Sequence, residues 1–159
     1  MIAFGDSHFQ HPISAPFLIR SEGGEDLCVS FIIAFPKYEY VPESSVGNEK
    51  LDAVLANATA ICPSEEQYEI LFENYILYQV RNESYATVDA VEVYKGSFLC
   101  IYEKSHLLDA LPLLTDCQIL ESGIPYPGKW KHYAILCQNH IIDVITCKEP
   151  TIRKITKHP

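Results

Sequence analysis

The chain has 159 residues, and its 21 Asp and Glu against 12 Lys and Arg give a formal net charge of −9 at pH 7. This length fits a single domain spanning residues 1–159, and 48% hydrophobic with 21% charged residues excludes wholesale disorder. The negative charge argues against nucleic-acid binding, which needs clustered Lys and Arg, and against binding to an anionic membrane surface.

The first half of the chain predicts two strands and a short helix. Residues 17–20 and the nearly continuous apolar run 27–35 are typical of strands, and residues 21–24 are typical of the turn between them. Within residues 48–58, apolar side chains recur at i, i+3, i+4 and i+7, which predicts a helix.

The middle of the chain predicts mainly strands. Residues 69–81 are rich in aromatic and β-branched side chains and predict one long strand. Residues 88–94 and 98–102 predict a hairpin that turns through Lys95-Gly96.

A helix and a final hairpin complete the prediction. Ser105 is a typical N-cap for a helix over residues 106–111, which Pro112 would end. Residues 131–138 and 141–147 predict a C-terminal hairpin. The fold class expected is therefore α+β, with a mainly antiparallel sheet and one or two short helices in a single domain.

The C-terminal hairpin also predicts which side chains share a face. If Asn139-His140 is a two-residue turn, His132 lies opposite Cys147, near enough for a thiolate–imidazolium pair. Asp143 shares that face but lies four strand residues from Cys147, roughly 13 Å away at about 3.3 Å per residue, too far to orient His132. Because the other face is apolar, we expect His132 and Asp143 to face solvent or a shallow groove.

Candidate catalytic residues are few and form no complete set. Besides His132 and Cys147, Ser7 follows Gly5-Asp6, a block that resembles the start of the GDS-type (SGNH) esterases, in which the Ser is the nucleophile. That family takes its base from a D-x-x-H motif, which this sequence lacks. His8 and His11, three residues apart, are expected to be exposed loop histidines, so no metal and no cofactor are predicted.

The cysteines predict a reducing compartment. The chain has six cysteines and no C-x-x-C motif, which favours reduced, mostly buried thiols over disulfides or a zinc site. Neither a secretory signal nor a long apolar span is recognisable, so a cytoplasmic location is expected.

The charge is distributed unevenly. Residues 148–159 hold four basic side chains and one acidic side chain, a net +3, so the preceding 147 residues carry −12. We expect this basic tail either to fold back on the acidic part of the chain or to stay loosely ordered over residues 152–159. The acidic and Tyr-rich middle predicts a surface that binds a basic protein. The candidate residues of that surface are Tyr75, Tyr78, Arg81, Glu83, Tyr85, Asp89, Trp130, His132 and Asp143.

Three blocks resemble a set of small bacterial proteins to which no activity is assigned. They are residues 78–85 (YQVRNESY), 103–109 (EKSHLLD) and 130–145 (WKHYAILCQNHIIDVI). The resemblance implies no catalytic residues. In size and acidity the chain is similar in general character to immunity proteins, which neutralise secreted toxins.

These observations together favour a non-enzymatic, acidic protein-binding domain, with an immunity-type inhibitor of a basic toxin as the specific expectation. Two alternatives stay open. One is a small hydrolase that uses a Cys/His or Ser/His pair, and the other is a small-ligand-binding module whose pocket is lined by Tyr and Trp130.

Overall fold

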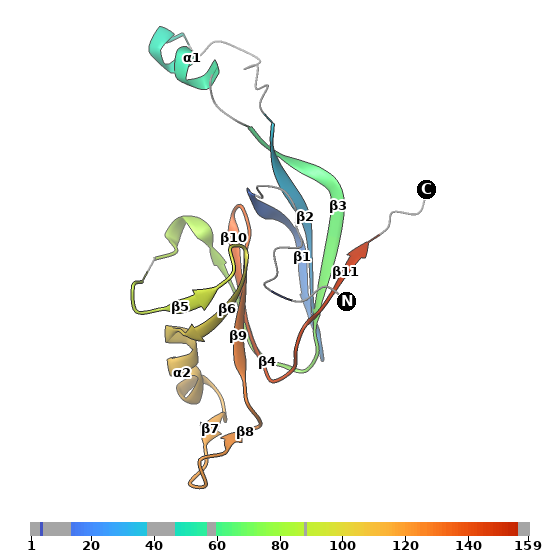
Figure 1. Cartoon of the computed structure of the whole chain (residues 1–159), viewed down its shortest axis with the longest axis vertical. Helices are drawn as coiled ribbons and strands as arrows, with labels where there is room; N and C mark the ends of the chain where they lie inside the picture. The colour runs from blue at the N-terminus through green and yellow to red at the C-terminus, as the bar shows by residue number, and fades with distance from the viewer. Residues whose placement is uncertain (1–3, 5–13, 38–46, 57–59, 88, 156–159) are drawn as a thin grey trace.

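Two antiparallel sheets make up most of the molecule (Figure 1). The structure, a computed structural model, describes residues 4, 14–37, 47–56, 60–87 and 89–155. Within these residues it has eleven strands, two α-helices and one short 3-10 helix, η1 (Glu83–Tyr85). The antiparallel sheet and the two short helices confirm the prediction, although the fold is richer in strands than a balanced α+β protein.

The first sheet has the strand order β1-β2-β3-β11. Its strands are β1 (Ser14–Gly23), β2 (Leu27–Lys37), β3 (Ala60–Phe72) and β11 (Thr151–Ile155). The two N-terminal strands are confirmed, but the predicted turn at residues 21–24 is displaced. Residues 21–23 pair with residues 27–29, so the chain turns at residues 24–26.

The predicted long strand over residues 69–81 is wrong, because the chain turns at Glu73 and Asn74 and enters the second sheet as β4 (Tyr75–Asn82). Asn74 has a positive φ of 47°, a conformation that Asn tolerates better than most residues. The Asp26 carboxylate accepts the Asn74 backbone N–H at 2.8 Å and holds this turn in place.

The second sheet has the order β4-β10-β9-β6-β5. Its other strands are β5 (Val93–Lys95), β6 (Leu99–Lys104), β9 (Lys131–Leu136) and β10 (His140–Thr146). The predicted hairpin through Lys95-Gly96 is confirmed as β5–β6. Gly96 has a φ of +103°, and a Cβ there would clash with the backbone of Leu99, so this turn requires glycine.

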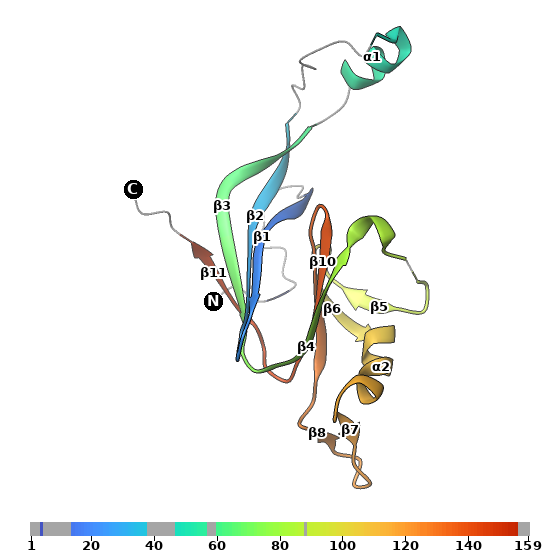
Figure 2. The ribbon, with the colours of Figure 1, turned by 180° about the vertical axis from the view of Figure 1, so that it is seen from behind.

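Helix α1 (Glu49–Ala56) confirms the N-terminal helix prediction for the residues described. The Asn48 side chain caps it by accepting the backbone N–H groups of Lys50 and Leu51. In both ribbon views α1 lies beyond the ends of β2 and β3, away from the second sheet (Figures 1 and 2).

Helix α2 (His106–Leu114) begins where predicted, with Ser105 as its N-cap. It does not end before Pro112 but runs through it, because the residues beyond Pro112 still close the last turn: the Thr115 N–H and hydroxyl both bond to the Leu111 carbonyl. After α2, the chain forms a small separate hairpin of β7 (Gln118–Ile119) and β8 (Pro125–Tyr126) before it enters β9.

One apolar core lies between the two sheets. The first sheet contributes Leu27, Val29, Phe31, Ile70 and Phe72, and the second contributes Tyr133, Ile135, Ile142 and Val144. Both sheets therefore bury their inner faces in the same core. Helix α2 covers the opposite, outer face of the second sheet (Figures 1 and 2).

The basic tail does fold back on the acidic part of the chain. Residues 151–155 form β11, which pairs with β3, and Ile152 is buried in the core. The alternative of a loosely ordered tail is therefore wrong for residues 152–155, and residues 156–159 lie outside the described part of the chain.

Candidate functional site

His132 and Asp143 face each other on the outer face of the second sheet. Asp143 lies opposite Ala134 and His132 opposite Ile145, so the predicted pairing of His132 with Cys147 is wrong. The cause is the position of the turn: the Cys137 N–H bonds to the His140 carbonyl, so the two-residue turn is Gln138-Asn139, one residue earlier than predicted, and Leu136 pairs with Ile141. The resulting two-residue shift keeps every side chain on its predicted face. It also makes His132 and Asp143 diagonal neighbours.

This diagonal arrangement brings the His132 Nε2 atom to 3.1 Å from Asp143 Oδ1. The separation of roughly 13 Å expected between Asp143 and Cys147 along the strand therefore does not keep Asp143 from reaching His132. The expected solvent exposure is also wrong, because His132 is 2% exposed and Asp143 is completely buried.

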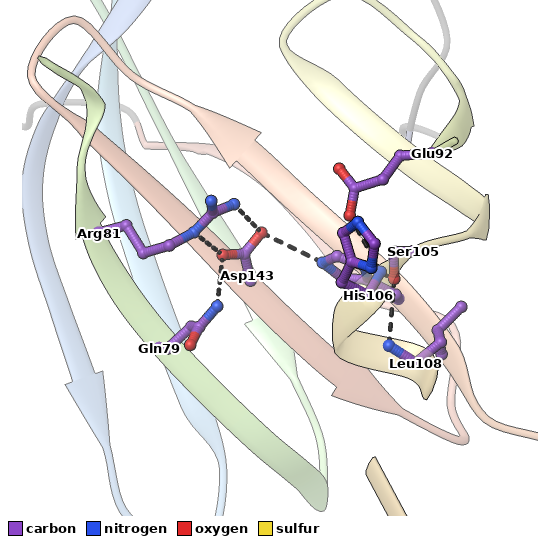
Figure 3. A network of polar contacts seen from close by, with 8 residues as sticks. Gln79, Arg81, Glu92, Ser105, His106, Leu108 and Asp143 are labelled. Atoms are coloured by element: carbon purple, nitrogen blue, oxygen red, sulfur yellow. Dashed lines mark hydrogen bonds and ion pairs between the residues drawn. The ribbon is translucent and has the colours of Figure 1, made fainter. Parts of the chain in front are cut away.

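Strand β4 supplies the other partners of Asp143. Gln79 lies directly opposite and donates from Nε2 at 3.0 Å, while Arg81, two residues further, donates from Nε at 2.7 Å and Nη2 at 3.1 Å. Burial acts to raise the pKa of Asp143, but hydrogen bonds from His132 and Arg81 outweigh it, so the pKa is lowered. Figure 3 shows Arg81 and Gln79 reaching the carboxylate from the same strand.

Ser105 joins the network from the start of α2. Its Oγ lies 2.8 Å from His132 Nδ1 and accepts the Leu108 backbone N–H at 3.1 Å (Figure 3). Because the Asp143 carboxylate can only accept, His132 donates to it from Nε2–H, while Nδ1 is bonded to the Ser105 hydroxyl. Tyr102 stacks on the imidazole at 4.2 Å with 14° between the ring planes.

Ser105, His132 and Asp143 are connected in the order of a hydrolase triad, but the exposure of Ser105 is unlike that of a nucleophile. A nucleophile must reach substrate, yet Ser105 is only 1% exposed and its oxygen already caps α2. Among the described residues, no buried side-chain N or O atom lacks a hydrogen-bond partner. The network fastens the start of α2 to β9, β10 and β4.

The other catalytic candidates do not join His132. Both of its ring nitrogens are taken by Ser105 and Asp143, and Cys147 is exposed just after β10 with Sγ beside Gly128. Partial burial and the neighbouring Cys117 raise the pKa of Cys147, which makes it less reactive than an ordinary thiol. Ser7, His8 and His11 lie outside the described residues.

The nine predicted surface residues do not share one surface. Arg81, His132 and Asp143 come together, but in the largely buried network. Tyr75 and Tyr78 contact each other edge to face and pack against the core between the sheets.

The remaining four surface candidates are separated from that network. Trp130 packs against the cluster under α2, while Tyr85 is 86% exposed and Glu83 is exposed beside it. The Asp89 carboxylate bonds to the His106 ring at 2.7 Å, which holds the chain before β5 against the first turn of α2. This bond raises the pKa of His106 and lowers that of Asp89.

Three carboxylates of residues 66–73 are neutralised by the C-terminal segment instead of forming a negative surface. Arg153 Nε lies 2.7 Å from Glu69, and Glu69 is nearly buried. Two lysines of the C-terminal segment form the other pairs, Lys154 with Glu66 and Lys148 with Glu73.

Unneutralised negative charge gathers instead on residues 83–121. This segment has seven carboxylates and two lysines, a net charge of −5. One lysine is already paired, Lys95 with Glu103. Four exposed carboxylates form no ion pair with any described residue: Glu83, Asp109, Asp116 and Glu121.

The same part of the chain exposes large apolar side chains. Ten of the sixteen exposed large hydrophobic residues in the described part of the chain lie between residues 85 and 126. They are Tyr85, Val91, Val93, Tyr94, Leu113, Leu114, Ile119, Leu120, Ile124 and Tyr126. Of these ten, only Tyr85 is among the nine predicted surface residues, because an apolar residue next to a helix or in a hairpin is expected to be buried. The signal available in the sequence concerned charge: no Lys or Arg occurs between residues 105 and 128 to neutralise the carboxylates of this region.

Comparison of the chain with known protein families, with curated proteins and with solved structures found no match. None of the helices in the described ranges is long and apolar enough to cross a membrane. Those ranges also contain no group of three or more His, Cys, Asp or Glu side chains placed to hold a metal ion.

Proposed function

We propose that this chain is a non-enzymatic protein-binding domain for a basic partner, of the immunity type, and that it acts in the cytoplasm. The observation that supports this most is the overlap of two features on residues 83–126. Unpaired carboxylates and exposed apolar side chains occur there together. Its six free cysteines fit a reducing compartment.

Each feature has its own role in recognition. Unpaired carboxylates speed the encounter with a positively charged protein, since attraction at long range raises the association rate. Exposed Leu, Ile and Tyr side chains supply the apolar contact area that keeps a complex together. The paired carboxylates of residues 66–73 do neither, because Arg153, Lys148 and Lys154 already neutralise them.

The first experiment isolates the partner and measures how charge affects its binding. Tagged full-length protein is used to capture partners from cells of its source organism, and the identified partner is purified. Association is then measured from about 50 mM to about 300 mM NaCl. This rise in salt shortens the distance over which exposed charges attract each other and so weakens electrostatic steering. We expect the association rate to fall with salt, while the dissociation rate changes little.

Matched variants locate the charge that matters. A triple variant, Asp109→Asn with Asp116→Asn and Glu121→Gln, should slow association about tenfold at low salt. A control triple variant removes the same charge elsewhere, with Glu22→Gln, Glu25→Gln and Glu65→Gln, and should associate at nearly the wild-type rate. An association rate that ignores both salt and the first triple variant would count against the proposal.

The connectivity of Ser105, His132 and Asp143 favours one second candidate, a serine hydrolase. A fluorophosphonate probe labels activated serines covalently, so it tests this candidate directly. We expect no labelling of Ser105, because its hydroxyl is buried and bonded to His132 and Leu108. Labelling that disappears in Ser105→Ala would replace the binding proposal with the hydrolase.

A further inference from the structure

Six exposed apolar side chains gather at the end of the molecule where α2 stops. Leu113 is 87% exposed and Ile119 and Ile124 are each 61% exposed. We call the whole set the apolar tip: Leu113, Leu114, Ile119, Leu120, Ile124 and Tyr126. Both ribbon views show the β7–β8 hairpin at the same end of the molecule as α2, away from α1 (Figures 1 and 2).

The apolar tip is a local structure outside both large sheets. Strands β7 and β8 pair only with each other, and the turn between them is closed by hydrogen bonds between Leu120 and Ile124 and from Gly123 to Leu120. Gly123 has a φ of +78°, which this turn requires. Such a short two-stranded hairpin gains little stability by itself in water. Its apolar side chains point to solvent rather than to a core.

Helix α2 already has its contacts with the body through other residues. Leu107, Leu108 and Leu111 pack in the cluster that includes Ile145 and Trp130. Leu113 and Leu114 therefore add nothing to that buried face. Exposed apolar side chains that lie together and are rimmed by polar residues commonly mark an interaction site.

The charge around the apolar tip indicates what covers it. Residues 105–128 contain three carboxylates, Asp109, Asp116 and Glu121, and no Lys or Arg. A second copy that docked tip to tip would bring like charges together, which disfavours self-association. A partner with Lys and Arg around apolar side chains complements both features.

We propose that the apolar tip is the docking site for a basic amphipathic segment of the partner, with apolar side chains facing the tip and Lys or Arg facing Asp109, Asp116 and Glu121. This inference rests on the proposed function and deepens it by assigning the site and the chemistry of the partner. Amphipathic segments commonly bind in this way, with a few apolar anchors and a charged flank that fixes orientation.

The test compares two synthetic peptides by NMR titration of the ¹⁵N-labelled full chain. One is a helical peptide of Leu and Lys with one apolar face, and the other replaces every Leu by Ser and keeps the charge. We expect the Leu/Lys peptide to shift backbone amide signals of residues 107–126 and to bind at least tenfold more tightly than the Ser/Lys peptide.

A variant of the apolar tip provides the matched comparison. Leu113→Ser with Ile119→Ser should weaken the Leu/Lys peptide at least tenfold, whereas Leu51→Ser with Val54→Ser on α1, also exposed, should leave its affinity unchanged. Because all four side chains face solvent, both variants should keep the wild-type dispersion of amide signals. If the double variant of the apolar tip loses this dispersion and is therefore unfolded, the single variant Ile124→Ser takes its place, and its affinity for the Leu/Lys peptide is measured in the same way.

The outcomes separate this inference from the function on which it rests. Equal binding of both peptides, with shifts around the carboxylates of residues 83–121, overturns the apolar tip but agrees with a basic partner. No shift with either peptide counts against both. A concentration-dependent dimer of the free protein that Leu113→Ser abolishes would make a second copy the occupant and overturn the inference.

Discussion

His132 Nε2 lies 3.1 Å from Asp143 Oδ1, although the two residues are not paired across the hairpin. Each lies diagonal to the other on neighbouring strands, a distance that a long or aromatic side chain can span. This contact joins β9 to β10, and Ser105 on one side and Arg81 on the other extend it to α2 and β4. One buried carboxylate therefore connects the β9–β10 hairpin to two elements that precede it in the sequence, α2 and β4.

Removal of that carboxylate should be costly. In Asp143→Ala, His132 and Gln79 lose a buried acceptor and Arg81 loses its counter-ion, so we expect a loss of about 3 kcal/mol in the free energy of unfolding. Asp143→Asn keeps one acceptor oxygen, so its free energy of unfolding should lie between those of wild type and Asp143→Ala. Equilibrium urea unfolding monitored by Trp130 fluorescence measures the difference. As a control, Glu65→Ala on the exposed face of β3 should change stability by no more than about 0.5 kcal/mol.

Ser105 has two bonds to lose. Ser105→Ala removes the N-cap of α2 and leaves His132 Nδ1 without its partner. Together these should lower the free energy of unfolding by about 2 kcal/mol. The exposed Ser122 in the β7–β8 turn provides the control, since Ser122→Ala should be nearly neutral. If the two variants proved equally stable, the hydrogen bonds of Ser105 would not support α2.

Stability should fall in acid for a reason that can be traced to Glu69. Partial burial acts to raise the pKa of Glu69, but hydrogen bonds from Cys28 and Arg153 outweigh it and leave the pKa below its ordinary value. A carboxylate with a lowered folded-state pKa contributes stability above its unfolded pKa of about 4.3 and loses that contribution as the pH falls further. Asp143 acts in the same direction.

The measurement compares urea unfolding of wild type and Glu69→Gln at several pH values between about 6 and about 3. Wild type should lose stability steadily below about pH 4.5, whereas the variant, already less stable at neutral pH, should lose less over the same range. Parallel curves for the two proteins would show that Glu69 does not titrate differently in the folded and unfolded states.

Side-chain faces and caps were predictable from the sequence because they depend on near neighbours. The hairpin prediction placed His132 and Asp143 on one face and Tyr133, Ile135 and Val144 on the other, which the structure confirms. An error of two residues in register does not change the face of any side chain. Ser105 was recognised as an N-cap from its position before an apolar helix.

What the sequence did not reveal depends on contacts between distant segments. Asn74 is of a residue type that turns favour, but one Asn within an aromatic and β-branched run was too weak a signal for the turn that sends β3 and β4 into different sheets. That turn is held by Asp26, 48 residues away. The pairing of Arg81 with Asp143 follows from β4 lying beside β10, which no local pattern indicates. These two errors hid the buried network.

Thiol reactivity tests the burial of the cysteines. Burial raises the pKa of Cys100 to about 11 and that of Cys137 to about 12, so both should resist iodoacetamide in the folded protein near neutral pH. Cys147 is exposed and should be labelled before them, but slowly, since its pKa is also raised. Mass spectrometry of peptides after timed labelling gives the order, and urea-unfolded protein provides the fully labelled reference. Fast, selective labelling of one cysteine would instead indicate an activated thiol.

The C-terminal strand should be necessary for the stability of the first sheet. Ile152 is 3% exposed in the core between the sheets, so Ile152→Ala should lower the free energy of unfolding by about 2–4 kcal/mol through lost contacts and the cavity left behind. Lys154→Ala, on the same strand but exposed and paired only at the surface with Glu66, should cost about 0.5 kcal/mol or less. Urea unfolding of the two variants and wild type decides between a structural strand and a dispensable tail. If Ile152→Ala were as stable as Lys154→Ala, β11 would contribute its charges to the fold but not its packing.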